Sequence, residues 1–195
     1  MNSGQRISYN GYEVCLFPMD YISPSQGYHG GMYASDWVGT TSNYPVYAPF
    51  SGTVQYYNVG DNTIWYVSDD KVWTPSGLTY VTVGMTHSND ISPAPWTEGQ
   101  HFTQGDLLYH TGNKGYSFGD HLHLDQMPRI ISQFADWQQY STPPFDIYYA
   151  SGTETVNEMQ MTSIFGTTRF RIWGTGGNFK WWMARYLLMK KRGGI

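Results

Sequence analysis

Apolar and polar residues alternate in short runs along most of this chain, and a period of two is typical of β-strands. Glycine, proline, serine and asparagine separate the runs, as expected for turns. The pattern predicts strands at 12–17, 45–57 (two strands joined by a turn), 63–67, 78–85, 104–110 and 145–149, and one more following residue 119. It predicts a loop at 18–27 and a connector at 90–105.

Only two segments have a pattern that favours helix. Residues 130–140 are followed by Pro143-Pro144, which would end a helix there, and residues 181–192 could form a short amphipathic helix. Aromatic residues make up 17% of the chain, charged residues 13%, and there are 22 glycines. This composition favours a mainly β fold, a small antiparallel β-sheet domain with many turns.

Charge divides the chain unevenly. Residues 169–195 hold seven of the eleven lysines and arginines and no acidic residue, so they carry +7 while the rest carries −11. A length of 195 residues is enough for one hydrophobic core and a short appendage. We therefore predict a domain at 1–150 and a basic, aromatic C-terminal extension at 151–195.

The ends and the cysteine content restrict the class of protein. Cys15 is the only cysteine, which excludes an intrachain disulfide and a cysteine-based zinc knot, and we expect it to be a small buried side chain. The first residues lack the basic start and apolar run of a signal peptide, and no apolar run is long enough to span a bilayer. If the protein acts outside a cell, we expect another route, such as a virion, to carry it there.

The stretch 111–125 contains the most informative pair of residues. His121 and His123 are separated by one leucine after a glycine-rich turn. In a strand both imidazoles would point to one face, and Leu122 and Leu124 to the other. This geometry suits a zinc site with one imidazole on the metal and the other beside it. The alternative is two histidines on a solvent-exposed face.

Three other residues could join this pair. His29 and Asp36 flank Gly30-Gly31, which would let the backbone fold back so that both side chains meet. The alternative is an ordinary glycine-rich loop. His87 stands where a predicted strand gives way to a loop, a position that often carries chemistry. Zinc is well served by two imidazole nitrogens and a carboxylate, with a fourth position open.

Together these stretches resemble the lysostaphin-type (LytM-type) zinc endopeptidases, which cut peptide cross-bridges in bacterial peptidoglycan. The segment 119–125, Gly-Asp-His-Leu-His-Leu-Asp, looks like the family's Gly-x-His-Leu-His-(Phe/Leu)-acid motif. The strand pair in 45–54 and the pair His29 and Asp36 are also similar. The resemblance covers about residues 12–128 and implies the family's β fold with a substrate groove.

The resemblance implies one Zn²⁺ per chain, held by His29, Asp36 and His123. His121 would be the catalytic histidine beside the metal, and His87 its partner. Zinc lowers the pKa of a bound water to about 7. One of the two catalytic histidines would accept the water proton, and the other would stabilise the oxyanion or protonate the leaving amine.

The chain departs from the family pattern in two places. Six residues separate His29 from Asp36, where most members have three, so Asp20 is an alternative ligand. Ser88 follows His87 in place of the usual leucine. A similar long spacing occurs in endopeptidase domains of tail-tip proteins from short-tailed phages of Gram-positive hosts. His101 and His110 are expected to be structural or solvated.

These features predict a zinc metallo-endopeptidase that hydrolyses stem or cross-bridge peptides of peptidoglycan, carried in a phage tail and acting on the cell wall during genome entry. The alternatives are a lysis-stage endolysin, an inactive wall-binding or tail-structural module of the same fold, and a zinc enzyme for another peptide. We expect the extension at 151–195 to dock onto other phage tail proteins; contact with anionic lipid or teichoic acid and a solvated tail are alternatives. Nucleic-acid binding is not expected.

Overall fold

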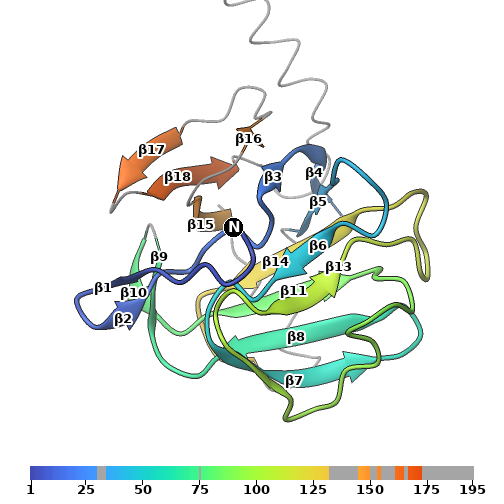
Figure 1. Ribbon diagram of the computed structural model, residues 1–195, viewed down its shortest axis with the longest axis horizontal. Helices are drawn as coiled ribbons and strands as arrows, with labels where there is room; N and C mark the ends of the chain where they lie inside the picture. The colour runs from blue at the N-terminus through green and yellow to red at the C-terminus, as the bar shows by residue number, and fades with distance from the viewer. Residues whose placement is uncertain are drawn as a thin grey trace, which may run out of the picture.

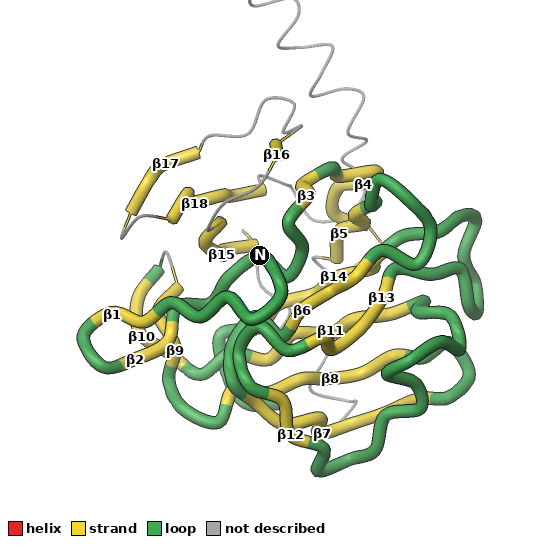
Figure 2. Tube along the Cα trace, viewed as in Figure 1, coloured by secondary structure: helices red, strands yellow, loops and turns green. Residues whose placement is uncertain are grey.

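The computed structural model describes residues 1–29, 34–74, 76–131, 145–149, 153–154, 161–164 and 167–172. Within these ranges the regular structure is β throughout, with no helix, and therefore no helix that could cross a membrane. The predicted mainly β, antiparallel fold is confirmed (Figures 1 and 2).

A seven-stranded sheet forms the body of the molecule. Each of its strands runs antiparallel to its neighbours. Its order is β12 (His101–Phe102), β7 (Gly52–Asn58), β8 (Thr63–Ser68), β11 (Thr82–Thr86), β14 (Leu122–Met127), β5 (Ala34–Trp37) and β4 (Pro24–His29).

Smaller strand groups surround this sheet (Figure 1). Four two-stranded sheets pair β1 (Ser8–Tyr9) with β2 (Tyr12–Glu13), β10 (Gly77–Thr79) with β9 (Val72–Thr74), β13 (Leu107–His110) with β6 (Pro45–Tyr47), and β16 (Thr153–Glu154) with β3 (Tyr21–Ile22). A three-stranded sheet has the order β15 (Phe145–Tyr149), β18 (Thr167–Ile172) and β17 (Met161–Ile164).

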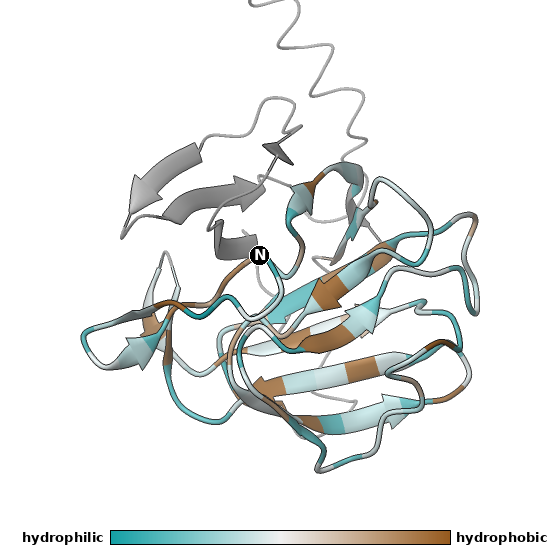
Figure 3. Cartoon of the chain, viewed as in Figure 1, coloured by the Kyte–Doolittle hydropathy of each residue, from teal (hydrophilic) through white to brown (hydrophobic). Residues whose placement is uncertain are grey.

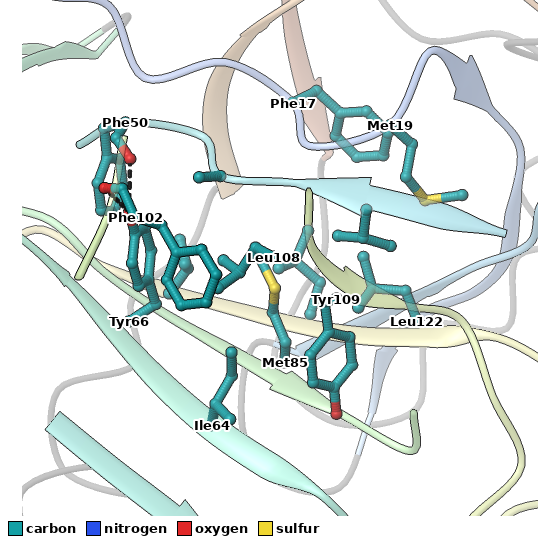
Figure 4. Packing of buried hydrophobic residues seen from close by; sticks show 14 of the residues in the cluster. Phe17, Met19, Phe50, Ile64, Tyr66, Met85, Phe102, Leu108, Tyr109 and Leu122 are labelled. Carbon is teal, nitrogen blue, oxygen red and sulfur yellow. Dashed lines mark hydrogen bonds between the residues drawn. The ribbon is translucent and has the colours of Figure 1, made fainter. Parts of the chain in front are cut away.

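The main core lies between the large sheet and the β6–β13 pair (Figure 4). Fully buried side chains from both layers meet there, and Cys15 is among them, as expected. Tyr66 of β8 contributes a buried ring whose hydroxyl lies 2.8 Å from the carbonyl oxygen of Phe50 and 2.9 Å from that of Phe102. These contacts tie β8 to the residues just before β7 and to the edge strand β12.

Alternation along β14 sets the two faces of the sheet. Leu122 and Leu124 are fully buried in the core, and His123 and Asp125 lie on the opposite face. Figure 3 shows brown bands separated by paler or teal bands along the strands of the large sheet. The prediction that His121 and His123 face away from the two leucines agrees with this burial pattern.

Several local predictions were wrong. The segment 18–27 contains β3 and most of β4, and the glycine-rich stretch ends in β5, whose four residues are all buried. Their partners, β14 and β16, come from distant parts of the sequence, so a local pattern of polar and glycine residues could not reveal the pairing. The single strand predicted at 78–85 is split into β10 and β11.

The predictions for the C-terminal region meet the structure only in part. Most of the helix predicted at 130–140, and the helix at 181–192, lie outside the described residues. The strand predicted at 145–149 is confirmed as β15; it pairs with β18, and β16 runs parallel to β3. The division into 1–150 and 151–195 stays a prediction.

Candidate active site

Asp36 and His123 meet because their strands are neighbours. In the pairing of β5 with β14, Asp36 lies directly opposite His123, and Trp37 opposite Leu122. Directly opposed residues on one face of an antiparallel pair have their side chains in reach of one another. The Oδ1 atom of Asp36 is 3.0 Å from Nδ1 of His123. The register between β5 and β14 thus brings the imidazole of His123 and the carboxylate of Asp36 together.

His121 lies two residues before His123, and its side chain points to the same site beside Asp36. Its backbone forms an isolated bridge with Gly112, which closes the base of the loop between β13 and β14. Its Nδ1 lies 2.8 Å from the carbonyl oxygen of Gly119. A carbonyl can only accept, so Nδ1 carries the proton in the neutral ring and Nε2 is left with its lone pair. This Nε2 lies 3.5 Å from Oδ1 of Asp36.

His87 enters from the end of β11. Thr86, the residue before it, lies opposite His123 in the sheet. The ring centroid of His87 is 4.8 Å from that of His121 and 5.7 Å from that of His123. Its Nδ1 lies 2.8 Å from the carbonyl oxygen of Lys114, so the same reasoning leaves Nε2 of His87 unprotonated.

The backbone at His87 is in an unusual conformation. Its φ is +83°, in the left-handed region that residues other than glycine rarely adopt. A Cβ on Gly112 would lie 2.2 Å from the carbonyl oxygen of His87, so only glycine permits this close approach. The conformation turns the chain out of β11 beside the loop that leads to His121, and it costs local strain of the kind often found at functional sites.

Burial and neighbouring charges shift the pKa values around the site. Burial lowers the pKa of His87, and the nearby His121 and His123 lower it further, which favours a neutral imidazole at pH 7. For His123 burial also acts to lower the pKa, but the hydrogen bond to Asp36 and the charge of Asp125 outweigh it and the net pKa is raised.

Asp125 is a buried carboxyl group behind the site. It lies 3.6 Å from Nε2 of His123 through Oδ2, and burial raises its pKa to about 6. Its Oδ1 atom is buried without a hydrogen-bond partner among the described residues. Asp125 therefore faces the ring edge of His123 that points away from Asp36.

A polar network fixes the loop between β13 and β14. Asp120 accepts hydrogen bonds from the hydroxyl of Thr111 and, at 3.0 Å, from the backbone N–H of Asn43. The backbone N–H of Lys114 donates to the carbonyl of His87 at 3.0 Å, and Asn113 receives the N–H of Gly119 at 2.8 Å. His87 and His121 are therefore held relative to each other by backbone contacts as well as by their own side chains.

The side chains of Asp36, His87, His121 and His123 line a groove of about 590 Å³. Its lining comprises Ser25, Gln26, Asp36, Val38, His87, Tyr116, Ser117, Phe118, Gly119, Asp120, His121 and His123. A cleft of this size, with an apolar wall and a few convergent polar groups, is typical of a ligand site.

The donor set fits zinc. Candidate ligand atoms of His87, His121 and His123 all lie within 4.8 Å of one another, and Asp36 adds a carboxylate oxygen. Two ligand atoms of a tetrahedral zinc site stand about 3.3 Å apart, given Zn–N and Zn–O bonds of about 2.0–2.1 Å. The separation of 3.0 Å between Asp36 and His123 is close to this value.

The other candidates lie in different surroundings. The side chain of His29 lies outside the described residues; its backbone ends β4 and pairs with Ala34. Asp20 accepts a hydrogen bond of 2.7 Å from the hydroxyl of Tyr44 and does not line the groove. His101 pairs with Asp69 at 2.7 Å on the surface, and His110 is in β13, outside the histidine cluster.

Sequence reasoning missed several residues of the site. Gln26 lies opposite Asp36 in β4, and the carbonyl groups of Lys114 and Gly119 orient the two catalytic candidates. A sequence motif does not indicate a backbone carbonyl, and the sequence predicts a loop over most of β4. The pair Tyr116 and Phe118 was visible in the sequence, but only the fold shows that it lines the groove.

Comparisons with known proteins give a phage relative and several partly similar peptidase structures. No family model matches the sequence. The chain is 27% identical over 161 residues to Morphogenesis protein 1 of Bacillus phage B103; the match covers 75% of this chain but only 43% of that relative. The chain therefore spans less than half the length of this relative.

Two similar solved structures are peptidases. The antimicrobial peptidase lysostaphin from Staphylococcus simulans has a TM-score of 0.45 and 21% identity, over 62% of this chain and 46% of that one. A zinc containing peptidase from Vibrio cholerae has a TM-score of 0.44 and 18% identity, over 59% and 39%.

Proposed function

We propose that this chain is a zinc-dependent endopeptidase that hydrolyses stem or cross-bridge peptides of bacterial peptidoglycan. The observation that carries the proposal is the convergence of Asp36, His87, His121 and His123 at one groove. His29, Asp36 and His123 are the proposed zinc ligands, and His87 and His121 the proposed catalytic residues. The motifs that resemble lysostaphin-type endopeptidases support the substrate class.

Zinc, when bound, supplies Lewis acidity that makes hydroxide available near neutral pH. Asp36 and His123 provide the two donors that the sheet register places side by side. Asp125, on the far edge of the His123 ring, favours a proton on Nε2 and so leaves Nδ1 for the metal.

His87 and His121 are both suited to move protons. In each ring the Nδ1–H donates a hydrogen bond to a backbone carbonyl, so both rings keep a basic Nε2. One Nε2 accepts the proton of the attacking water and becomes an N–H; the other ring donates to the carbonyl oxygen or the leaving amine when its own Nε2 carries a proton. The lowered pKa of His87 keeps that ring neutral, and hence basic, at pH 7.

We further propose that the protein is a phage virion component that acts on the cell wall from the tail during genome entry. The similarity to Morphogenesis protein 1 of a Bacillus phage supports a phage role. The basic segment 169–195 gives the extension at 151–195 the charge to dock onto an acidic partner, and we propose other tail proteins for that role.

The test combines metal content with wall lysis. The chain is purified without added metal, its zinc is measured by mass spectrometry, and clearing of Gram-positive cell walls is followed with and without a chelator. We expect about one zinc per chain and clearing that the chelator stops and added zinc restores. His121→Ala should abolish clearing, whereas His101→Ala, at an exposed histidine away from the groove, should retain it.

One result would overturn the catalytic proposal. If the chain took up no zinc after reconstitution and cleared no wall, it would be a wall-binding or tail-structural module of the same fold. Clearing that is independent of zinc would overturn the metal assignment alone.

A further inference from the structure

Two aromatic side chains stand in solvent beside the proposed active site. Tyr116 is 86% exposed and Phe118 is 89% exposed. The next most exposed large apolar residue in the described part of the chain is Val59, at 66%. The two rings pack edge to face with centroids 5.2 Å apart. Aromatic residues normally gain free energy when they are buried, and this exposed pair does not. Its exposure points to a ligand that covers it.

The segment that carries the rings is held firmly at its base. It begins at Gly115, whose φ is +80° and where a Cβ would lie 2.6 Å from the Cβ of Asp61. It ends at Gly119, whose N–H is bound by Asn113. Ser117, between the rings, donates to the carbonyl of Gly119 at 3.0 Å. The pair is therefore presented in advance, so binding would not have to order the loop.

The rings belong to the same groove as the histidines. Both line it together with His121, which follows Phe118 by three residues. The other lining groups are neutral or acidic; no lysine or arginine occurs among the described lining residues. Bound zinc would offset the charge of Asp36, which leaves Asp120, two residues after Phe118, as the negative charge beside the rings; it disfavours a carboxylate there and suits an uncharged ligand.

We propose that Tyr116 and Phe118 form a subsite for an N-acetylated sugar ring of the peptidoglycan glycan strand. This rests on the proposed function, in which the scissile peptide is attached to that strand. A pyranose ring presents a face of C–H groups that carry slight positive charge, and the face of an aromatic ring is negative. The acetyl methyl group adds apolar surface, and the sugar carries no charge.

The peptide itself is the weaker occupant. Cell-wall peptides carry free carboxylates, which the acidic surroundings of the pair disfavour. The peptide also has to reach the histidines beside Asp36, whereas both rings are largely exposed to solvent. The exposed part of the groove at the two rings therefore holds the glycan, and the part beside the histidines holds the peptide.

The first experiment measures binding without catalysis. A β-1,4-linked tetramer of N-acetylglucosamine is titrated into the full chain, and binding is followed by calorimetry and by the NMR signals of the aromatic rings. We expect the double variant Tyr116→Ala/Phe118→Ala to bind about tenfold or more weakly. The matched control is Tyr12→Ala, at an exposed tyrosine of the β1–β2 hairpin, at the other end of the molecule from the β13–β14 loop (Figure 1).

The second experiment separates glycan from peptide. KM and kcat are measured on intact cell walls and on cross-linked peptides freed of glycan by an amidase. We expect the double variant to raise KM on walls by at least fivefold more than on glycan-free peptides. An equal loss on both substrates would assign the rings to the peptide and overturn the proposal, as would a wild-type chain that fails to bind the tetramer.

The two proposals can fail separately. A chain that binds the tetramer through these rings but cleaves no wall would contradict the proposed function and keep the glycan subsite. A chain that cleaves walls but binds no glycan would contradict the glycan subsite and keep the proposed function.

Discussion

Oδ1 of Asp36 lies 3.0 Å from Nδ1 of His123, across the antiparallel pair of β5 and β14. This contact belongs to one of two possible sets of zinc ligands in the groove. Zinc could be held by Asp36 and His123 together with His29, or by the three imidazoles of His87, His121 and His123. Removing ligands one at a time distinguishes them.

Replacing Asp36 by asparagine should weaken zinc binding by at least about tenfold, because the charged oxygen ligand is lost. His121→Ala and His87→Ala should keep the metal and lose hydrolysis. Competition with a chromophoric chelator measures the affinity of each variant. Loss of zinc in both histidine variants, with zinc retained in Asp36→Asn, would assign the metal to the three imidazoles.

Backbone strain at His87 gives a prediction that does not depend on the metal. With φ at +83°, alanine keeps the unfavourable contact of a Cβ, and glycine removes it. His87→Gly should therefore be more stable than His87→Ala by about 1 kcal/mol in urea unfolding, although both variants lose the imidazole. Equal stabilities would mean that the left-handed backbone is not present in solution.

The buried carboxyl of Asp125 predicts a pH dependence of the metal-free protein. Its pKa is raised to about 6 by burial, so the folded state holds a proton that the unfolded state has already released. Below about pH 4 the carboxyl is protonated in both the folded and the unfolded state, so it does not change the free energy of unfolding with pH. As pH rises from about 4 to about 6, the free energy of unfolding should fall by on the order of 2–3 kcal/mol.

Asp125→Asn should flatten this part of the profile, because the amide does not titrate. Chemical unfolding of the chelator-treated protein at a series of pH values measures it, with the wild-type chain as reference. An unchanged slope in the variant would exclude Asp125 as its source.

Tyr66 offers a test of the core. Its hydroxyl lies within hydrogen-bond distance of the carbonyls of Phe50 and Phe102, and its ring is fully buried (Figure 4). Tyr66→Phe should lower the free energy of unfolding by about 1–3 kcal/mol, since the single hydroxyl proton that these two carbonyls share is lost. Tyr12→Phe, at an exposed position, should change it by less than about 0.5 kcal/mol.

The sequence was informative where the physics is local. The period of two in 121–124 placed two histidines on one face and two leucines on the other, because successive side chains of a strand point to opposite sides. The runs at 45–57 and 63–67 became β6, β7 and β8 for the same reason. Asp36, His87, His121 and His123 were all named from motifs and spacing, and the all-β class followed from composition.

Only the tertiary structure decided what depends on distant partners. The strands β4 and β5 have little strand pattern of their own; they exist because β14 pairs with β5 and extends the sheet to them. The same pairing sets Asp36 opposite His123, and the backbone carbonyls of Lys114 and Gly119 select the protonated nitrogen of the catalytic candidates. Tyr116 and Phe118 were plain aromatic residues in the sequence, and the fold placed them on the groove. Sequence pattern determines which face a side chain occupies; register between strands far apart in the chain determines what it meets there.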